Sequence, residues 1–226
     1  MTFQDRHLVI LVHGAVERGT GFRAVVELLP DYDVIAYDRR GHGLRWLEGT
    51  ASLGEDIDEL LGLIDDRVAT VVGHSLGGLI VLGAALRRPE LFASLGLYET
   101  AIPWSDWWSE VEREVMITEI DRSAEAMASG SSLERDRLNV AWQSCRRQVL
   151  EAFDGPFHWQ DVEVPIVTGR GELSQANSAR DASVVARYFH LEALILRGSD
   201  HRAHRSNPKE FADFVRACVG AKTEWS

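Results

Sequence analysis

The feature that most constrains this 226-residue chain is a five-residue segment, Gly73-His74-Ser75-Leu76-Gly77. An apolar run at 69–72 leads into it, and a stretch at 76–88 rich in small apolar residues follows it. A serine hydroxyl is a good nucleophile only when a base removes its proton. A sharp strand-to-helix turn exposes that hydroxyl, and the flanking glycines prevent collisions in the strained backbone. The segment therefore predicts Ser75 as a nucleophile, with the Leu76 N–H facing a developing oxyanion.

Short β-branched runs alternate with longer amphipathic stretches along most of the chain. This alternation is typical of an α/β protein with a parallel sheet. Ser52, followed three residues later by Glu55, predicts a capping box at the start of a helix. The expected strands are 8–12, 33–37, 69–72, 94–98, 165–170 and 193–196, and the expected helices are 22–29, 53–64, 76–88, 176–188 and 208–219.

The alternation stops in the middle of the chain. Between 102 and 161 there is no buried strand pattern, whereas tryptophans are frequent and charged helical patterns cover 110–122 and 133–152. We therefore predict a helical cap insert at 102–161 on an α/β core formed by 1–101 and 162–226.

Composition excludes several classes of function. The net charge of −11 and the pI near 5.2 argue against nucleic-acid binding, which needs clustered Lys and Arg. Cys145 and Cys218 provide neither a disulfide framework nor metal-ligand spacing. No apolar run has the length of a membrane span or of a signal-peptide core. We expect a cytoplasmic protein with a small-molecule substrate and no metal, cofactor, nucleic-acid or membrane partner; its oligomeric state is open.

Together with three further motifs, the serine turn resembles the α/β-hydrolase superfamily over nearly the whole chain. Leu11-Val12-His13-Gly14-Ala15 resembles its oxyanion loop, the Asp-Arg-Arg-Gly-His-Gly segment at 38–43 its next loop, and Gly198-Ser199-Asp200-His201 its histidine loop. The resemblance implies a mostly parallel central sheet with flanking helices. Only about seven residues precede the first expected strand, so we expect a shortened N-terminal edge. The resemblance also implies a second oxyanion donor, the backbone N–H of Ala15 or Val16.

The general base is expected late in the chain, where two histidines are candidates. We favour His201, because it follows the last expected strand after four loop residues, where the family places its base. His204 could reach the same side of the loop, or could be a solvated or helix-capping residue. The histidines of the other motifs are expected to stabilise the structure around them: His13, His42 and His74.

The acid departs from the usual family pattern. Counting from Pro165 places Ser174 at the acid position, and a hydroxyl cannot balance an imidazolium charge. Glu172 lies two places earlier. Glu99 ends an apolar strand next to the nucleophile strand, where a buried carboxylate needs a partner. The segment around it also resembles a subset of the superfamily with glutamate at this site, including haloalkane-dehalogenase-like members. We favour Glu99 and keep Glu172 as the alternative.

The cap and the loop at 38–43 are less informative. By resemblance, the cap tryptophans could line an apolar substrate pocket, or they could simply pack the cap onto the core. Arg39 and Arg40 are expected to form surface ion pairs rather than to bind an anionic substrate. The cap residues concerned are Trp104, Trp107, Trp108 and Met116.

The favoured function is that of a serine hydrolase that cleaves a carboxylic ester, lactone or thioester of a small apolar substrate through an acyl-enzyme on Ser75. Two alternatives stay open. One is a cofactorless lyase, acyltransferase or cyclase on the same scaffold, and the other is a catalytically silent binding protein. The haloalkane dehalogenases use an aspartate nucleophile, so the serine excludes their chemistry here.

Overall fold

The computed structural model of the protein describes residues 6–100, 132–154 and 158–221, together with positions 111, 114, 117 and 118. Within these residues, six strands form one sheet in the order β2-β1-β3-β4-β5-β6, and every neighbouring pair is parallel. The predicted fold class, a parallel sheet flanked by helices, is confirmed. The strands are β1 (Leu8–Val12), β2 (Asp33–Ala36), β3 (Ala69–His74), β4 (Phe92–Tyr98), β5 (Ile166–Gly171) and β6 (Leu194–Leu196).

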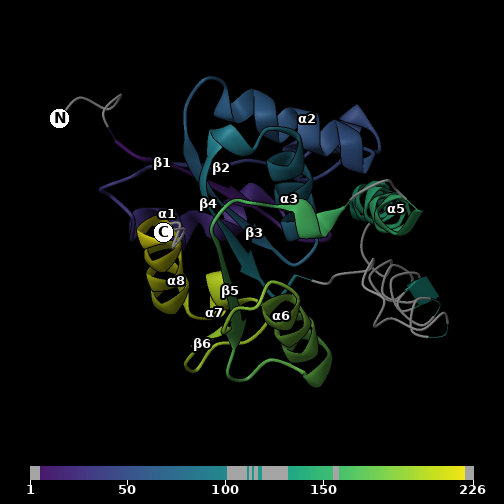
Figure 1. The fold of residues 1–226 in the computed structure, drawn as a ribbon. Helices are drawn as coiled ribbons and strands as arrows, with labels where there is room; N and C mark the ends of the chain where they lie inside the picture. Colours follow the sequence, from purple (N-terminus) through teal and green to yellow (C-terminus); the bar gives the residue numbers. More distant parts are fainter. Residues whose placement is uncertain are drawn as a thin grey trace.

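Helices cover both faces of the sheet (Figure 1). On one face α8 (Pro208–Gly220) packs beside α1 (Arg23–Glu27), and on the other α2 (Leu53–Ile64) packs against α3 (Gly77–Arg87). Further helices with described bounds are α5 (Ser132–Asp154), α6 (Ala176–Tyr188) and the short α7 (Ala203–Ser206), and the 3-10 turns are η2 (Gly19–Phe22), η3 (Gly43–Glu48), η4 (Pro89–Leu91) and η5 (Trp159–Asp161).

Strand β1 shows why the sheet lies in the centre of the molecule. All five of its residues are buried, as expected for a continuous apolar run in a parallel sheet with both faces covered. Alternate side chains enter two separate cores: Leu8, Ile10 and Val12 pack with α2 and α3, whereas Val9 and Leu11 pack with α1 and α8. This period-two alternation fixes the register, because a slip of one residue would exchange the two sets.

The start of α2 matches its sequence signal. The Ser52 side chain accepts a hydrogen bond from the Glu55 N–H at 3.1 Å, and the Glu55 carboxylate accepts one from the Ser52 N–H at 2.8 Å. The predicted capping box is therefore confirmed. The expected helix at 22–29 is shorter than predicted, because the 3-10 turn η2 precedes it and α1 ends at Glu27.

Helix α5 is the described part of the predicted cap. Ala141, Cys145, Val149 and Ala152 lie buried on one of its faces at helical spacing, and the helix contacts α2 and η3. The other expected cap helix lies mostly outside the described residues, so the division into core and cap stays a prediction. Among the helices of the described residues, none is both long and apolar enough to cross a membrane.

Candidate active site

Ser75 occupies the turn between β3 and α3, and its backbone φ of 52° lies in the left-handed region. That conformation is strained for a residue other than glycine and is common at functional sites. Both flanking glycines are required by close backbone contacts. A Cβ atom at Gly73 would lie 2.6 Å from the Gly78 Cα, and one at Gly77 would lie 2.3 Å from the Val12 carbonyl oxygen. The turn therefore folds sharply enough to present the serine at the carboxyl end of the sheet.

Glu99 follows β4 directly, and its side chain is fully buried. Its Oε2 accepts a hydrogen bond from His201 Nδ1 at 2.6 Å. Its Oε1 accepts bonds from the Gly171 N–H, at 2.7 Å, and from the Ser174 hydroxyl. Burial alone would raise the pKa of Glu99, but the bonds from His201, Ser174 and Gly171 outweigh it and hold the pKa below its usual value. Glu99 is therefore an ionised carboxylate that orients the His201 ring.

The other two candidates for the acid lie differently. Ser174, at the position predicted for the usual family acid, donates its hydroxyl to the Glu99 carboxylate. Glu172 accepts the Gly198 N–H at 2.8 Å and makes no contact with His201 in the described part of the chain. The structure thus brings Glu99, not Glu172, to the histidine.

Backbone contacts hold the nucleophile turn and the histidine loop side by side. The Ser75 N–H donates to the Tyr98 carbonyl at 2.9 Å, next to Glu99. His74 Nε2 lies 2.7 Å from the His201 carbonyl oxygen, and the two imidazole rings are 4.7 Å apart. The described residues include no hydrogen bond between the Ser75 hydroxyl and His201.

The loop after β1 passes directly against Ser75, the predicted nucleophile. A Cβ atom at Gly14 would lie 3.1 Å from the Ser75 Cβ. Within the described residues, the N–H groups of Ala15 and Leu76 have no hydrogen-bond acceptor. The Val16 N–H differs. Burial raises the pKa of the Cys145 thiol, and a hydrogen bond from this N–H is one of the contacts that oppose the shift.

A buried cluster that the sequence did not predict lies beneath the nucleophile turn. Glu17 Oε2 is 2.8 Å from His74 Nδ1, and Glu17 Oε1 is 3.3 Å from His204 Nε2. A carbonyl oxygen can only accept, so His74 Nε2 donates to that of His201. Because His74 Nε2 already carries one ring hydrogen, His74 Nδ1 must carry another in order to donate to Glu17. Burial would raise the pKa of Glu17, but His74 and His204 hold it far below its usual range, so the cluster contains an ion pair.

This cluster bears on two expectations. His204 is buried, so the interpretation of it as a solvated residue is wrong. The ligand atoms of Glu17, His74 and His204 all lie within 4.8 Å of one another, a grouping that could hold a metal ion. However, the 2.8 Å separation between Glu17 and His74 is that of a charge-assisted hydrogen bond, which a proton explains.

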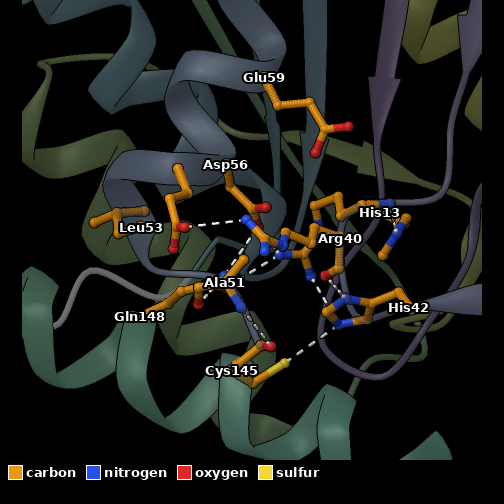
Figure 2. Close-up of polar contacts among 12 residues, drawn as sticks. His13, Arg40, His42, Ala51, Leu53, Asp56, Glu59, Cys145 and Gln148 are labelled. Carbon is orange, nitrogen blue, oxygen red and sulfur yellow. Dashed lines mark hydrogen bonds and ion pairs between the residues drawn. The ribbon is translucent and has the colours of Figure 1, made fainter. Parts of the chain in front are cut away.

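A second buried ion pair lies behind the loop that follows β1. Arg39 is fully buried, and its Nη1 donates to Asp56 at 2.7 Å and to Gln148 at 3.1 Å. Figure 2 shows Asp56, from α2, and Gln148, from α5, in this network. The expectation of a surface ion pair is thus wrong for Arg39, because its charge is balanced inside the protein. It holds for Arg40, which is exposed and pairs with Glu55.

His13 and His42 also belong to this region. The Arg39 N–H donates to His13 Nε2 at 3.1 Å, so His13 Nδ1 carries the hydrogen that bonds the Gly14 carbonyl at 2.9 Å. His42 Nδ1 donates to the Arg40 carbonyl at 3.0 Å. Burial, and then the Arg39 charge, lowers the pKa of both rings, that of His42 to about 3. Both are therefore neutral groups that hold their own loops.

A cavity of about 290 Å³ lies between the loop after β1 and the N-terminal half of α5. Val16, Leu133 and Leu138 give it apolar walls, and arginines and glutamates of both neighbouring segments add charges of both signs. A larger hollow of about 570 Å³ is lined by Arg18 and Arg205, and neither of these two hollows is lined by Ser75 or His201. The predicted pocket residues of the cap, Trp104, Trp107 and Trp108, lie outside the described residues.

The sequence contains recognisable signals for two buried charged residues that were not predicted. Asp56 falls within the apolar stripe of 53–64, three residues after Leu53 and four before Leu60. A charge at such a position needs a buried partner. Glu17 similarly follows an apolar strand and a His-Gly pair within five residues.

Comparison with known proteins places this chain in a family. The model of the alpha/beta hydrolase family matches residues 9–214. RutD of Rhizobium rhizogenes, which is named as a carbamate hydrolase, is 33% identical over 255 residues that cover 97% of this chain and 95% of RutD. The hydrolase YugF of Bacillus subtilis is 37% identical over 98 residues, which cover 41% of this chain and only 36% of YugF. A structure of an esterase from Thermogutta terrifontis superposes with a TM-score of 0.70 at 20% identity, covering 93% of this chain and 88% of that one, and shows the shared fold. The chain belongs to the alpha/beta hydrolase family and is an enzyme of that family.

Proposed function

We propose that this hydrolase cleaves a carboxylic ester, lactone or thioester of a small substrate through an acyl-enzyme on Ser75. The observation that carries the proposal is the 2.6 Å hydrogen bond between Glu99 and His201 Nδ1, one strand away from the serine turn. With a hydrogen on Nδ1, a neutral His201 has its lone pair on Nε2 and can accept the serine proton. Glu99 then stabilises the imidazolium that forms.

In the proposed reaction, the Ser75 oxygen attacks the carbonyl carbon while its proton passes to His201. The tetrahedral intermediate collapses, and the leaving alcohol or thiol takes the proton from His201. Water then attacks the acyl-enzyme and gives its proton to the same nitrogen. When the second intermediate collapses, Ser75 recovers its hydrogen and the carboxylic acid leaves.

We assign the oxyanion hole to the backbone N–H groups of Ala15 and Leu76. Leu76 precedes α3, so its N–H is one of the groups without an intrahelical acceptor, at the positive end of the helix dipole. Of the two expected donors in the preceding loop, the Val16 N–H faces the Cys145 thiol, whose pKa it helps to lower against the effect of burial. That contact favours Ala15 as the second donor.

The cap tryptophans stay predicted contributors to an apolar wall. The similarity to RutD over nearly the whole chain adds carbamates to the substrates worth testing, because serine attack on a carbamate uses the same groups.

The test is the Ser75→Ala variant, with the exposed Ser132→Ala variant as a matched control. We expect Ser75→Ala to lose hydrolysis of short nitrophenyl esters and labelling by a fluorophosphonate, and Ser132→Ala to keep both. Labelling that persists in Ser75→Ala would contradict the proposal. A labelled wild-type enzyme that turns over no ester, thioester, lactone or carbamate would instead favour the non-hydrolytic alternatives.

A further inference from the structure

The peptide groups on both sides of Gly14 are held by buried side chains. The Gly14 carbonyl accepts hydrogen bonds from Arg39 Nη2 at 3.0 Å and from His13 Nδ1 at 2.9 Å. The Gly14 N–H donates to Glu17 Oε2 at 3.2 Å. All three side chains are buried. This short loop segment therefore has a fixed orientation although it belongs to no helix or strand.

The direction of the Gly14 carbonyl determines the direction of the next N–H. In a trans peptide, the carbonyl of one residue and the N–H of the following residue point in opposite directions. The carbonyl faces Arg39, so the Ala15 N–H faces away from it. Because Gly14 itself lies against Ser75, that N–H can face the substrate oxygen.

We propose that Arg39 is a positioning residue for the oxyanion hole, which fixes the Gly14–Ala15 peptide and couples it to helix α5. This inference rests on the proposed function, since it concerns the donor that would stabilise the acyl-transfer intermediate. Arg39 does not touch the reacting atoms and acts through the Gly14 peptide. Its contribution is preorganisation, because a donor that is already aimed needs no rearrangement during the reaction.

The planar guanidinium of Arg39 suits this role because it bonds in two directions at once. Nη1 binds Asp56 and Gln148, and Nη2 binds the Gly14 carbonyl. Gln148 completes the network by donating to Asp56 at 2.9 Å and to the Ala51 carbonyl at 3.3 Å. Figure 2 shows Gln148 and Cys145 of α5 facing Asp56 and His42 of the core. The position of α5 is thereby linked to the peptide that carries the oxyanion donor.

The discriminating variant is Arg39→Lys. A lysine keeps a positive charge beside Asp56 but offers a single ammonium group, which cannot reproduce the two-directional fork. The matched control is Arg40→Lys, which changes the neighbouring arginine, an exposed one. Because Arg39→Lys could fail to fold, a second variant, Arg39→Met with Asp56→Leu, removes both charges and leaves none unpaired.

We expect Arg39→Lys to lower kcat about 10- to 100-fold while KM changes less than about twofold, since loss of one oxyanion donor costs about 100-fold or more. The affinity for a trifluoromethyl ketone, which forms a tetrahedral adduct with the serine, should fall by the same factor as kcat. The double variant should show the same pattern. Arg40→Lys should leave both quantities unchanged.

A crystal structure of Arg39→Lys gives a readout that does not depend on activity, and we expect the Gly14 carbonyl to be turned from its wild-type direction. The inference is overturned if both Arg39 variants keep the wild-type kcat, the wild-type affinity for the ketone and the wild-type orientation of the Gly14 peptide. If the wild-type enzyme itself shows no serine-dependent activity, the proposed function fails, whereas the crystal structure still decides whether Arg39 holds the peptide.

Discussion

Replacing Glu99 with glutamine isolates its electrostatic role, because the two side chains have the same shape. In the described part of the chain, Oε1 accepts from two donors, the Gly171 N–H and the Ser174 hydroxyl, whereas Oε2 accepts from His201 only. A glutamine keeps both donors satisfied only when its carbonyl oxygen takes the place of Oε1. Its amide nitrogen must then face His201 Nδ1.

That orientation disables the base. A glutamine N–H that points at His201 forces Nδ1 to become an acceptor, so the ring hydrogen moves to Nε2, the nitrogen that should take the serine proton. In serine proteases, the equivalent change of tautomer lowers kcat by about 10⁴. We expect a similar factor here, which corresponds to about 5.5 kcal/mol of transition-state stabilisation at 1.36 kcal/mol per tenfold change. The fold should persist, because the bonds from Gly171 and Ser174 are retained.

The assay is kcat/KM for a short nitrophenyl ester, together with the rate of fluorophosphonate labelling of Ser75. Glu172→Gln is the matched control, since Glu172 is the alternative acid and, among the described residues, its carboxylate accepts only the Gly198 N–H. We expect its activity to stay within about threefold of wild type, as for a surface residue. The reasoning is refuted if Glu99→Gln keeps near wild-type activity, and the acid assignment is reversed if Glu172→Gln shows the large loss.

Two further expectations concern stability. Gly77→Ala should destabilise the fold by about 3 kcal/mol or more in urea unfolding, because its Cβ would lie 2.3 Å from the Val12 carbonyl oxygen; an unchanged midpoint would contradict the described turn. Lowering the pH should reduce the free energy of unfolding more in the wild type than in the Glu17→Gln variant. The pKa of Glu17 is lower in the folded state than its usual 4.5, so its contribution is present above that pH and is lost as the pH falls below it. If wild type and Glu17→Gln lose the same free energy of unfolding between pH 6 and pH 3, the Glu17 carboxylate is not the source of the acid sensitivity.

The regular part of the fold could be predicted because its physical signals are local. The helix predicted at 176–188 has the same limits as α6, and the capping box at Ser52 is present as written in the sequence. The strands are apolar runs of the length expected in a covered parallel sheet. Glu99 was identifiable because a carboxylate at the end of such a run needs a partner, and its partner lies 2.6 Å away at His201.

The buried ion pairs could not be predicted with their partners. Arg39 and Asp56 are 17 residues apart, and Gln148 joins them from 109 residues beyond Arg39, so no spacing rule connects them. An arginine after a strand is exposed in most proteins, which is why its burial was not expected. Glu17 and His204 were missed for the same reason, since their pairing depends on how the loop after β1, the end of β3 and helix α7 meet in space.

These ion pairs lie where the backbone is strained. Of the five described residues other than glycine with positive φ, three belong to the candidate site: Val16, Ser75 and Glu99. Each such residue costs about 1–3 kcal/mol and persists only where its surroundings hold it. A buried ion pair adds little net stability, because desolvation offsets the attraction, but breaking it leaves an unpaired charge and costs several kcal/mol. The pairs of Glu17 with His74 and of Arg39 with Asp56 are thus suited to fix one arrangement of the loops around the serine.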